Sequence, residues 1–202
     1  MSSHAKVLVV IAAASVGVVI GLALAFLFMQ DTTPTYPEPH AEVRTLFYSN
    51  IDLDPIGACD VVFPVERTVS FASAEEAGNA KRRAKAVLTH LFTGPTAEEV
   101  HQGFSSFFSS ETANLMRSVH IAGSGERTAY IDLHDLRHAL AGANSSCGSL
   151  SFFAQVEHTM RATVGVAQIR YAFEGDPEMF YDWMQIGCDA TTDLCDPGPF
   201  RQ

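Results

Sequence analysis

SAEEAGNAKRRAKAVLTHLFTGPT, residues 73–96, contains the beginning, the buried face and the end of one helix. Ser73, with Glu76 three residues later, forms a capping box. Thr93, Gly94 and Pro95 end the helix. Apolar side chains recur between these points on one helical stripe, made of Ala77, Ala80, Ala84, Val87, Leu88 and Leu91. We therefore predict a single helix from Ser73 to Thr93 with one face in the core.

The polar face of this helix is basic, because it carries Lys81, Arg82, Arg83 and Lys85. Such a cluster can bind an acidic partner. It is also typical of a solvated helix in which acidic residues at the start and basic residues further along complement the helix dipole. We favour the second interpretation.

Extended segments and a second helix surround this stretch. In order, they are strands at Val43–Tyr48 and at Val61–Phe71 (interrupted by Pro64), a hairpin of Leu115–Ile121 and Thr128–Leu133, a helix from Ser146 or Ser149 to about Thr163, and a strand at Val166–Phe173. This order predicts an α+β fold with two helices packed on one face of a small mixed sheet. Three aromatic residues follow, Phe180, Tyr181 and Trp183, which either cover the edge of the core or form a contact patch; we favour the core.

Val7–Met29 is an uncharged apolar stretch that is long enough to cross a bilayer as a helix. We predict one transmembrane helix there. A cleavable signal peptide is the alternative, because Ala23-Leu24-Ala25 fits a cleavage site. Lys6 precedes the stretch, which places the domain outside the cytoplasm. The predicted parts are a cytoplasmic N-terminus at 1–6, the transmembrane helix at 7–29, a proline-containing linker at 30–40, a domain at 41–187 and a disulfide-loop tail at 188–202.

The net charge and the cysteines limit the classes of binding partner and the cellular compartment that fit this chain. The formal net charge of −10 argues against nucleic acid, and it makes an anionic lipid surface a poor partner. All the cysteines follow the apolar stretch, so an oxidising compartment would let them pair. Among the possible connectivities of Cys59, Cys147, Cys188 and Cys195 we favour Cys59 with Cys147 and Cys188 with Cys195; buried free thiols are the alternative.

Histidines offer the best candidates for metal chemistry. His134 and His138 have the spacing of neighbours on one helix face, beside Asp132 and Asp135. A catalytic zinc would need a third ligand, and the sequence has no HExxH motif. We favour solvated surface histidines, and we assign no catalytic residue, metal site or cofactor.

Several segments together resemble the GerMN domain of bacterial sporulation and germination proteins. They are PVERTVSF, AVLTHLFTGPTAEEVHQGFSSFF, TAYIDL, SLSFFAQVEHTM and VAQIRYAFEG, and they cover roughly residues 41–185. The most specific part is Leu91-Phe92-Thr93-Gly94-Pro95-Thr96, followed by Glu99 and Gly103. Physically these residues and Arg67 look structural, because Gly94 and Pro95 end a helix and Arg67 can satisfy carbonyls or a carboxylate.

The resemblance implies a βαββαβ-like domain, similar to ring-building modules of envelope secretion systems, that works by protein contact and not by catalysis. We therefore expect a single-pass protein of the bacterial cell membrane. Its extracytoplasmic domain would be a scaffold that binds envelope proteins or a second copy, with a role related to sporulation or germination. A metal-dependent envelope hydrolase using His134 and His138 is one alternative. A module that binds cell-wall glycan, such as peptidoglycan, is another.

Overall fold

The structure is a computed structural model that describes residues 38–188 and 194–201. The described residues belong to one compact unit that begins at Glu38. The predicted transmembrane helix at 7–29, the N-terminus at 1–6 and most of the predicted linker lie outside the described residues. In the part of the chain that is described, no helix combines the length and the apolar character needed to cross a membrane.

The strands form two small sheets, not the single sheet that we predicted. The first has the order β2-β1-β3, with β1 (His40–Asn50), β2 (Phe63–Phe71) and β3 (Phe104–Ser105) all antiparallel. The second has the order β4-β5-β6, with β4 (Met116–Ala122) antiparallel and β6 (Gln168–Phe173) parallel to β5 (Thr128–Leu133). The α+β class is confirmed, and every predicted strand exists.

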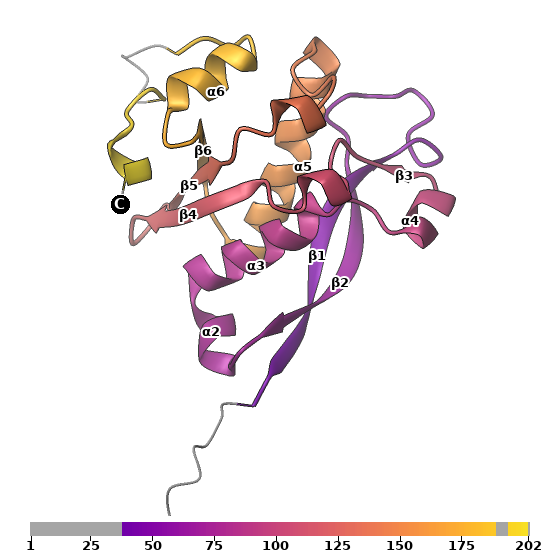
Figure 1. Cartoon of the computed structure of the whole chain (residues 1–202). Coiled ribbons are helices and arrows are strands. Elements are labelled where there is room, and N and C mark those ends of the chain that lie inside the picture. The colour runs from indigo at the N-terminus through magenta and orange to yellow at the C-terminus, as the bar shows by residue number, and fades with distance from the viewer. Residues whose placement is uncertain (1–37, 189–193, 202) are drawn as a thin grey trace, which may run out of the picture. The chain divides into compact units, whose positions relative to one another are not determined.

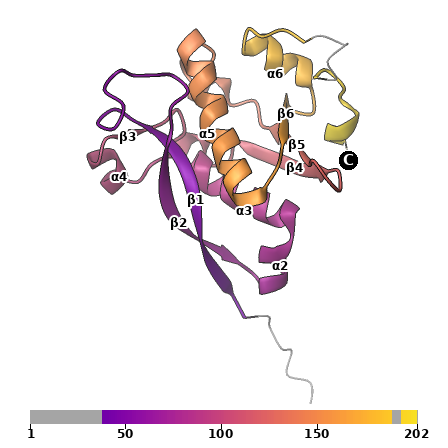
Figure 2. The same cartoon turned by 180° about the vertical axis from the view of Figure 1, so that it is seen from behind.

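Two helices explain why the sheets stay separate. Helix α3 (Ala80–Phe92) contacts both β1 and β4, and helix α5 (Ser146–Val164) packs along β1 and against α3 (Figures 1 and 2). The Thr159 hydroxyl of α5 accepts a hydrogen bond from the backbone N–H of Phe47 in β1, at 3.0 Å. The helix therefore occupies the side of β1 where the next strand of a single sheet would pair.

The predicted helix over Ser73–Thr93 is interrupted. It consists of α2 (Ala74–Gly78) and α3, with Asn79 in an extended conformation between them. The Asn79 side chain accepts a hydrogen bond from the backbone N–H of Arg82, at 3.1 Å, so it is the N-cap of α3. Asparagine is a strong N-cap and glycine is a poor helix former, so the Gly78-Asn79 pair outweighs the continuous apolar stripe.

The ends of α5 differ slightly from the prediction. Ser145, and not Ser146 or Ser149, is its N-cap, and Gly165 ends it in a left-handed conformation. Several short elements were not predicted. They are α4 (Ala97–His101), α6 (Pro177–Trp183) and the 3-10 turns η1 (Ser110–Thr112), η2 (Arg137–Ala139) and η4 (Gly198–Arg201).

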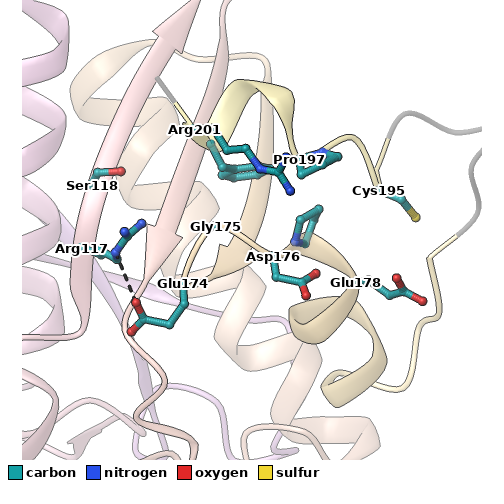
Figure 3. A pocket seen from close by; sticks show the side chains of 11 residues that line it. Arg117, Ser118, Glu174, Gly175, Asp176, Glu178, Cys195, Pro197 and Arg201 are labelled. Atoms are coloured by element: carbon teal, nitrogen blue, oxygen red, sulfur yellow. Dashed lines mark ion pairs between the residues drawn. The ribbon is translucent and has the colours of Figure 1, made fainter.

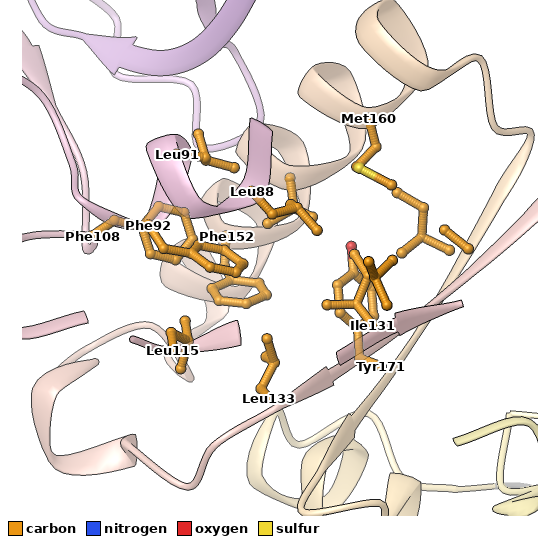
Figure 4. Close-up of a cluster of buried hydrophobic side chains, with 14 of the residues drawn as sticks. Leu88, Leu91, Phe92, Phe108, Leu115, Ile131, Leu133, Phe152, Met160 and Tyr171 are labelled. Carbon is orange, nitrogen blue, oxygen red and sulfur yellow. The ribbon is translucent and has the colours of Figure 1, made fainter. Parts of the chain in front are cut away.

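One main core joins both sheets and both long helices (Figure 4). Ile131 and Leu133 of β5 lie in it, as the alternation of apolar residues predicts. Phe180 of α6 is fully buried and stacks on Tyr171 of β6, with ring centroids 5.0 Å apart. The neighbouring Tyr181 is also buried. Phe180 and Tyr181 of α6 therefore complete the core, as we favour from the sequence.

Candidate interaction surface

The connection between β1 and β2 exposes large apolar side chains at one end of the domain. Its members are Ile51 (61 % exposed), Leu53 (58 %), Ile56 (92 %) and Val61 (38 %). Leu150 of α5 is also exposed, and it lies three residues after Cys147, on the same helix face. We call these five residues the apolar surface. Large exposed apolar side chains that are gathered in one loop are typical of sites of interaction.

The Asn50 side chain holds the start of this loop. It is buried, and its oxygen accepts hydrogen bonds from the backbone N–H groups of Asp52 (2.9 Å) and Leu53 (3.1 Å). Its amide nitrogen donates to the carbonyl of Gln102, at 2.9 Å. Further along, the Asp54 carboxylate accepts from the N–H of Ala58, at 2.6 Å. Local side-chain bonds therefore give the loop a defined turn conformation.

A disulfide attaches the end of the loop to the first turn of α5. Cys59 is bonded to Cys147, with 5.0 Å between their Cα atoms. Cys188 is bonded to Cys195 in the tail, with a Cα–Cα distance of 5.5 Å. Both spacings are ordinary for disulfides, and these are the two pairs that we favour from the sequence. The first bond joins the loop to the helix turn that precedes Leu150.

A hollow of about 360 Å³ opens beneath the loop. Its lining includes Ile51, Val61, Phe107, Gly148 and the Cys59–Cys147 bond. A side chain at Gly148 would overlap the Gly142 backbone, so glycine is required there. The hollow has the size and the lining to receive an apolar side chain from a partner.

Acidic residues lie in the same loop as the apolar surface. From Thr45 to Glu66 the sequence contains no lysine or arginine, whereas Asp52, Asp54 and Asp60 lie in the loop. Asp52 and Asp60 are exposed. The loop therefore combines exposed apolar side chains with negative charge.

The residues of the family motif lie directly behind this surface. Arg67 of β2 donates from Nε to Glu99 Oε1 at 2.8 Å, pairs through Nη2 with Glu99 Oε2, and also donates to the Gly94 carbonyl at 3.2 Å. Burial opposes ionisation of Glu99, but hydrogen bonds from Arg67 and Thr96 outweigh it, so the pKa of Glu99 is lowered. The hydrogen bond to Glu99 likewise raises the pKa of Arg67. The pair joins β2 to the first turn of α4.

Glycines of the motif make close backbone approaches possible. Gly94 has a φ of +76°, and a side chain there would overlap the Phe108 carbonyl. Pro95 follows it, and Thr96 then begins α4 with a capping box to Glu99. Gly103 has a φ of +84°, and its carbonyl accepts from the N–H of Ile51, at 3.2 Å. The motif therefore supports the loop that carries the apolar surface.

The predicted histidine pair does not share a helix face. His134 follows the end of β5, and His138 lies in the 3-10 turn η2. The Nδ1 atom of His134 lies 3.0 Å from Oε1 of Glu174. This hydrogen bond is the largest cause of the lowered pKa of Glu174. Within residues 38–188 and 194–201, no group of three or more His, Cys, Asp or Glu side chains could hold a metal ion.

Glu174 also borders a larger, polar hollow of about 720 Å³ (Figure 3). Arg117 of β4 forms an ion pair there with Glu174, at 3.2 Å, and a second one with the buried carboxylate of Asp132. Asp132 accepts a further hydrogen bond from the Gly175 N–H, at 2.7 Å. These charged groups are bound to one another, so the network's evident role is to hold β4 and β5 to the turn after β6.

Sequence patterns alone did not reveal the apolar surface, because Asp, Pro and Gly between the first two strands predict only a loop. A signal was present. Ile51, Leu53 and Ile56 are large apolar residues in a segment with turn chemistry and a cysteine, where a solvated loop would be polar.

These features describe a small α+β domain that carries an exposed apolar surface attached by a disulfide. A family model described as "Germane: Sporulation and spore germination" matches residues 45–178, more than half of the chain. The chain therefore belongs to this family of sporulation and germination domains, which confirms the resemblance to GerMN domains. No curated protein and no solved structure matches the chain.

Proposed function

We propose that this chain is a membrane-anchored, extracytoplasmic protein-contact domain of a bacterial cell envelope, with a role in sporulation or germination. The observation that carries the proposal is the apolar surface, where Ile51, Leu53 and Ile56 are each more than half exposed. A soluble domain gains nothing in stability from such side chains in water, and a partner that covers them gains the free energy of their burial.

The loop is suited to binding because it is ordered before a partner arrives. Asn50 and the Cys59–Cys147 bond fix its two ends. Less conformational entropy is then lost on association than with a free loop of the same composition.

Charge indicates the chemistry of the partner. Asp52, Asp54 and Asp60 lie in the same loop as the apolar side chains, and no basic residue lies between Thr45 and Glu66. The complementary partner is an envelope protein that presents an apolar side chain to the hollow, with lysine or arginine beside it. A second copy bound through the same surface would bring these aspartates together across a two-fold axis, so we favour a different protein.

The anchored, exported topology rests on the apolar stretch at 7–29 and on the cysteine pairs. Disulfides such as Cys59–Cys147 persist in oxidising compartments, which supports a location outside the cytoplasm. Membership of the Germane family supports the link to sporulation. We propose contact and not catalysis as the activity.

The experiment replaces apolar side chains of the surface by aspartate in the native cell. Ile51→Asp with Ile56→Asp puts charge where burial is expected. Recovery of the envelope partner with the affinity-tagged full chain should then fall by at least about tenfold, because two buried apolar contacts are lost. The partner's contacting peptide should contain an apolar residue flanked by lysine or arginine.

Ile186→Asp is the matched control. Ile186 is an isoleucine of similar exposure (53 %), and it lies just after α6. The control should keep wild-type recovery. Equal recovery with all variants would overturn the proposal, and so would a partner peptide that is acidic.

A further inference from the structure

A basic cluster stands out on this acidic chain. Residues 81–85, KRRAK, hold four of the thirteen lysines and arginines, and Lys81 and Lys85 are the only lysines after Lys6. Lys81, Arg82 and Lys85 are exposed, and Arg83 is partly buried. We call these four residues, with Arg44 of β1, the basic cluster.

Helix stability does not explain the cluster. The break at Asn79 places Lys81, Arg82 and Arg83 in the first turn of α3, which contains no acidic residue. Positive charge is unfavourable there, because the N-terminal end of the helix dipole is itself positive. The dipole interpretation that we favoured from the sequence is therefore wrong for α3, since it assumed a helix that began at Ser73.

Neighbouring carboxylates neutralise only part of the cluster. Arg82 pairs with Glu76, at 3.3 Å, and Arg44 pairs with Glu42. Within the described part of the chain, neither lysine of the cluster forms an ion pair. Burial, and then the charge of Arg83, lower the pKa of Arg44, so positive groups repel each other here. A surplus of positive charge remains.

The cluster lies at the end of the domain where the N-terminal segment is attached. His40 at the start of β1 pairs with Phe71, and α2 begins three residues after Phe71 (Figures 1 and 2). The apolar surface follows Asn50, at the opposite end of β1, roughly 33 Å from His40 along the strand. Residues 30–39 separate the predicted membrane span from β1, and they reach at most about 35 Å when extended.

We propose that the basic cluster binds the anionic phosphate headgroups of the membrane that anchors the chain, which directs the apolar surface away from the bilayer. The inference rests on the anchored topology proposed above. The net charge of the chain does not oppose it, because charges more than about 10 Å away are screened at physiological salt. Local charge then decides the contact, and the tether keeps the cluster near the surface.

The test uses the full chain in nanodiscs of phosphatidylcholine alone or with about 30 % phosphatidylglycerol, an anionic membrane. A water-soluble amine reagent modifies Lys81 and Lys85, and mass spectrometry gives the rate at each. We expect both lysines to react at least about fivefold more slowly in the anionic discs, and the difference to disappear at high salt. Equal rates in the two kinds of disc would overturn the lipid contact.

Variants separate this contact from general charge effects. Arg82→Gln removes one exposed charge of the cluster, and it should bring the lysine rates in anionic discs back toward the neutral values. Arg161→Gln removes an exposed arginine of α5 and should leave the protection intact. Protection of the lysines in neutral discs by a soluble polyphosphate polymer, without protection in anionic discs, would assign the cluster to a wall polymer and overturn the lipid proposal.

Co-elution of the chain with the nanodiscs tests the membrane anchor separately. A chain that does not co-elute with either kind of disc contradicts the anchored topology and the lipid contact together. Co-elution with unchanged lysine rates contradicts the lipid contact alone.

Discussion

Cys59, in the loop between β1 and β2, is bonded to Cys147, in the first turn of α5 and 88 residues further along the chain. This bond joins the two segments that form the apolar surface. The second disulfide, between Cys188 and Cys195, closes a separation of only 7 residues. The two bonds therefore differ both in position and in the length of chain that they close.

Removing the long-range disulfide should cost more stability than removing the short one. The chain-entropy model gives about 2 kcal/mol more for the longer loop. We expect Cys59→Ala with Cys147→Ala to lower the free energy of unfolding by about 2–4 kcal/mol in guanidinium titrations. Cys188→Ala with Cys195→Ala is the control. A larger loss in the control would contradict this assignment.

Glu99→Gln should destabilise the domain by about 3 kcal/mol, because it leaves the guanidinium of Arg67 partly buried without its counter-charge. Glu157→Gln breaks a more exposed pair with Arg161 on α5 and should cost less than about 0.5 kcal/mol. Chemical denaturation measures both. Similar small losses in the two variants would mean that the Arg67–Glu99 pair does not support the fold.

The lowered pKa of Glu99 predicts that the stability of the domain depends on pH. The pKa of Glu99 is lowered in the folded state, so the unfolded chain takes up a proton first as the pH falls. Its contribution is therefore fully present above the unfolded pKa of about 4.3 and is lost as the pH falls through the folded value. The stability difference between the wild type and Glu99→Gln should shrink in this acidic window. A difference that is constant from neutral pH to pH 3 would contradict the account.

Lys81→Glu should stabilise the domain, although it removes part of the basic cluster. A carboxylate in the first turn of α3 interacts favourably with the helix dipole, and we expect a gain of about 0.5 kcal/mol in low salt. Lys85→Glu lies beyond the first turn and should change stability little. Thermal unfolding of both variants measures the difference. A loss of stability in Lys81→Glu would show that this lysine supports the fold.

Local patterns in the sequence predict the elements better than their assembly. The alternation in Thr128–Leu133 and the Gly94-Pro95 helix end depend on neighbours in the chain, and both occur where predicted. The division into two sheets depends on the packing of α3 and α5 against β1, which is a non-local contact that periodicity does not encode. The break at Asn79 was readable, because Gly78-Asn79 combines a weak helix former with a strong cap.

The candidate site shows the same contrast between local sequence patterns and their assembly in space. Arg67, Gly94, Thr96 and Glu99 are recognisable as a motif, but only the structure brings them together behind the β1–β2 loop. The apolar surface needs the contact between that loop and α5, which come from distant parts of the chain.

Site-specific photo-cross-linking from position 56 in living cells tests the central claim most directly. A photoreactive residue in place of Ile56 should join the chain to one envelope protein, and the same residue in place of Ile186 should give at most about a tenth of that yield. Equal yields at the two positions, or reaction at position 56 with lipid alone, would contradict a protein-contact role for the apolar surface.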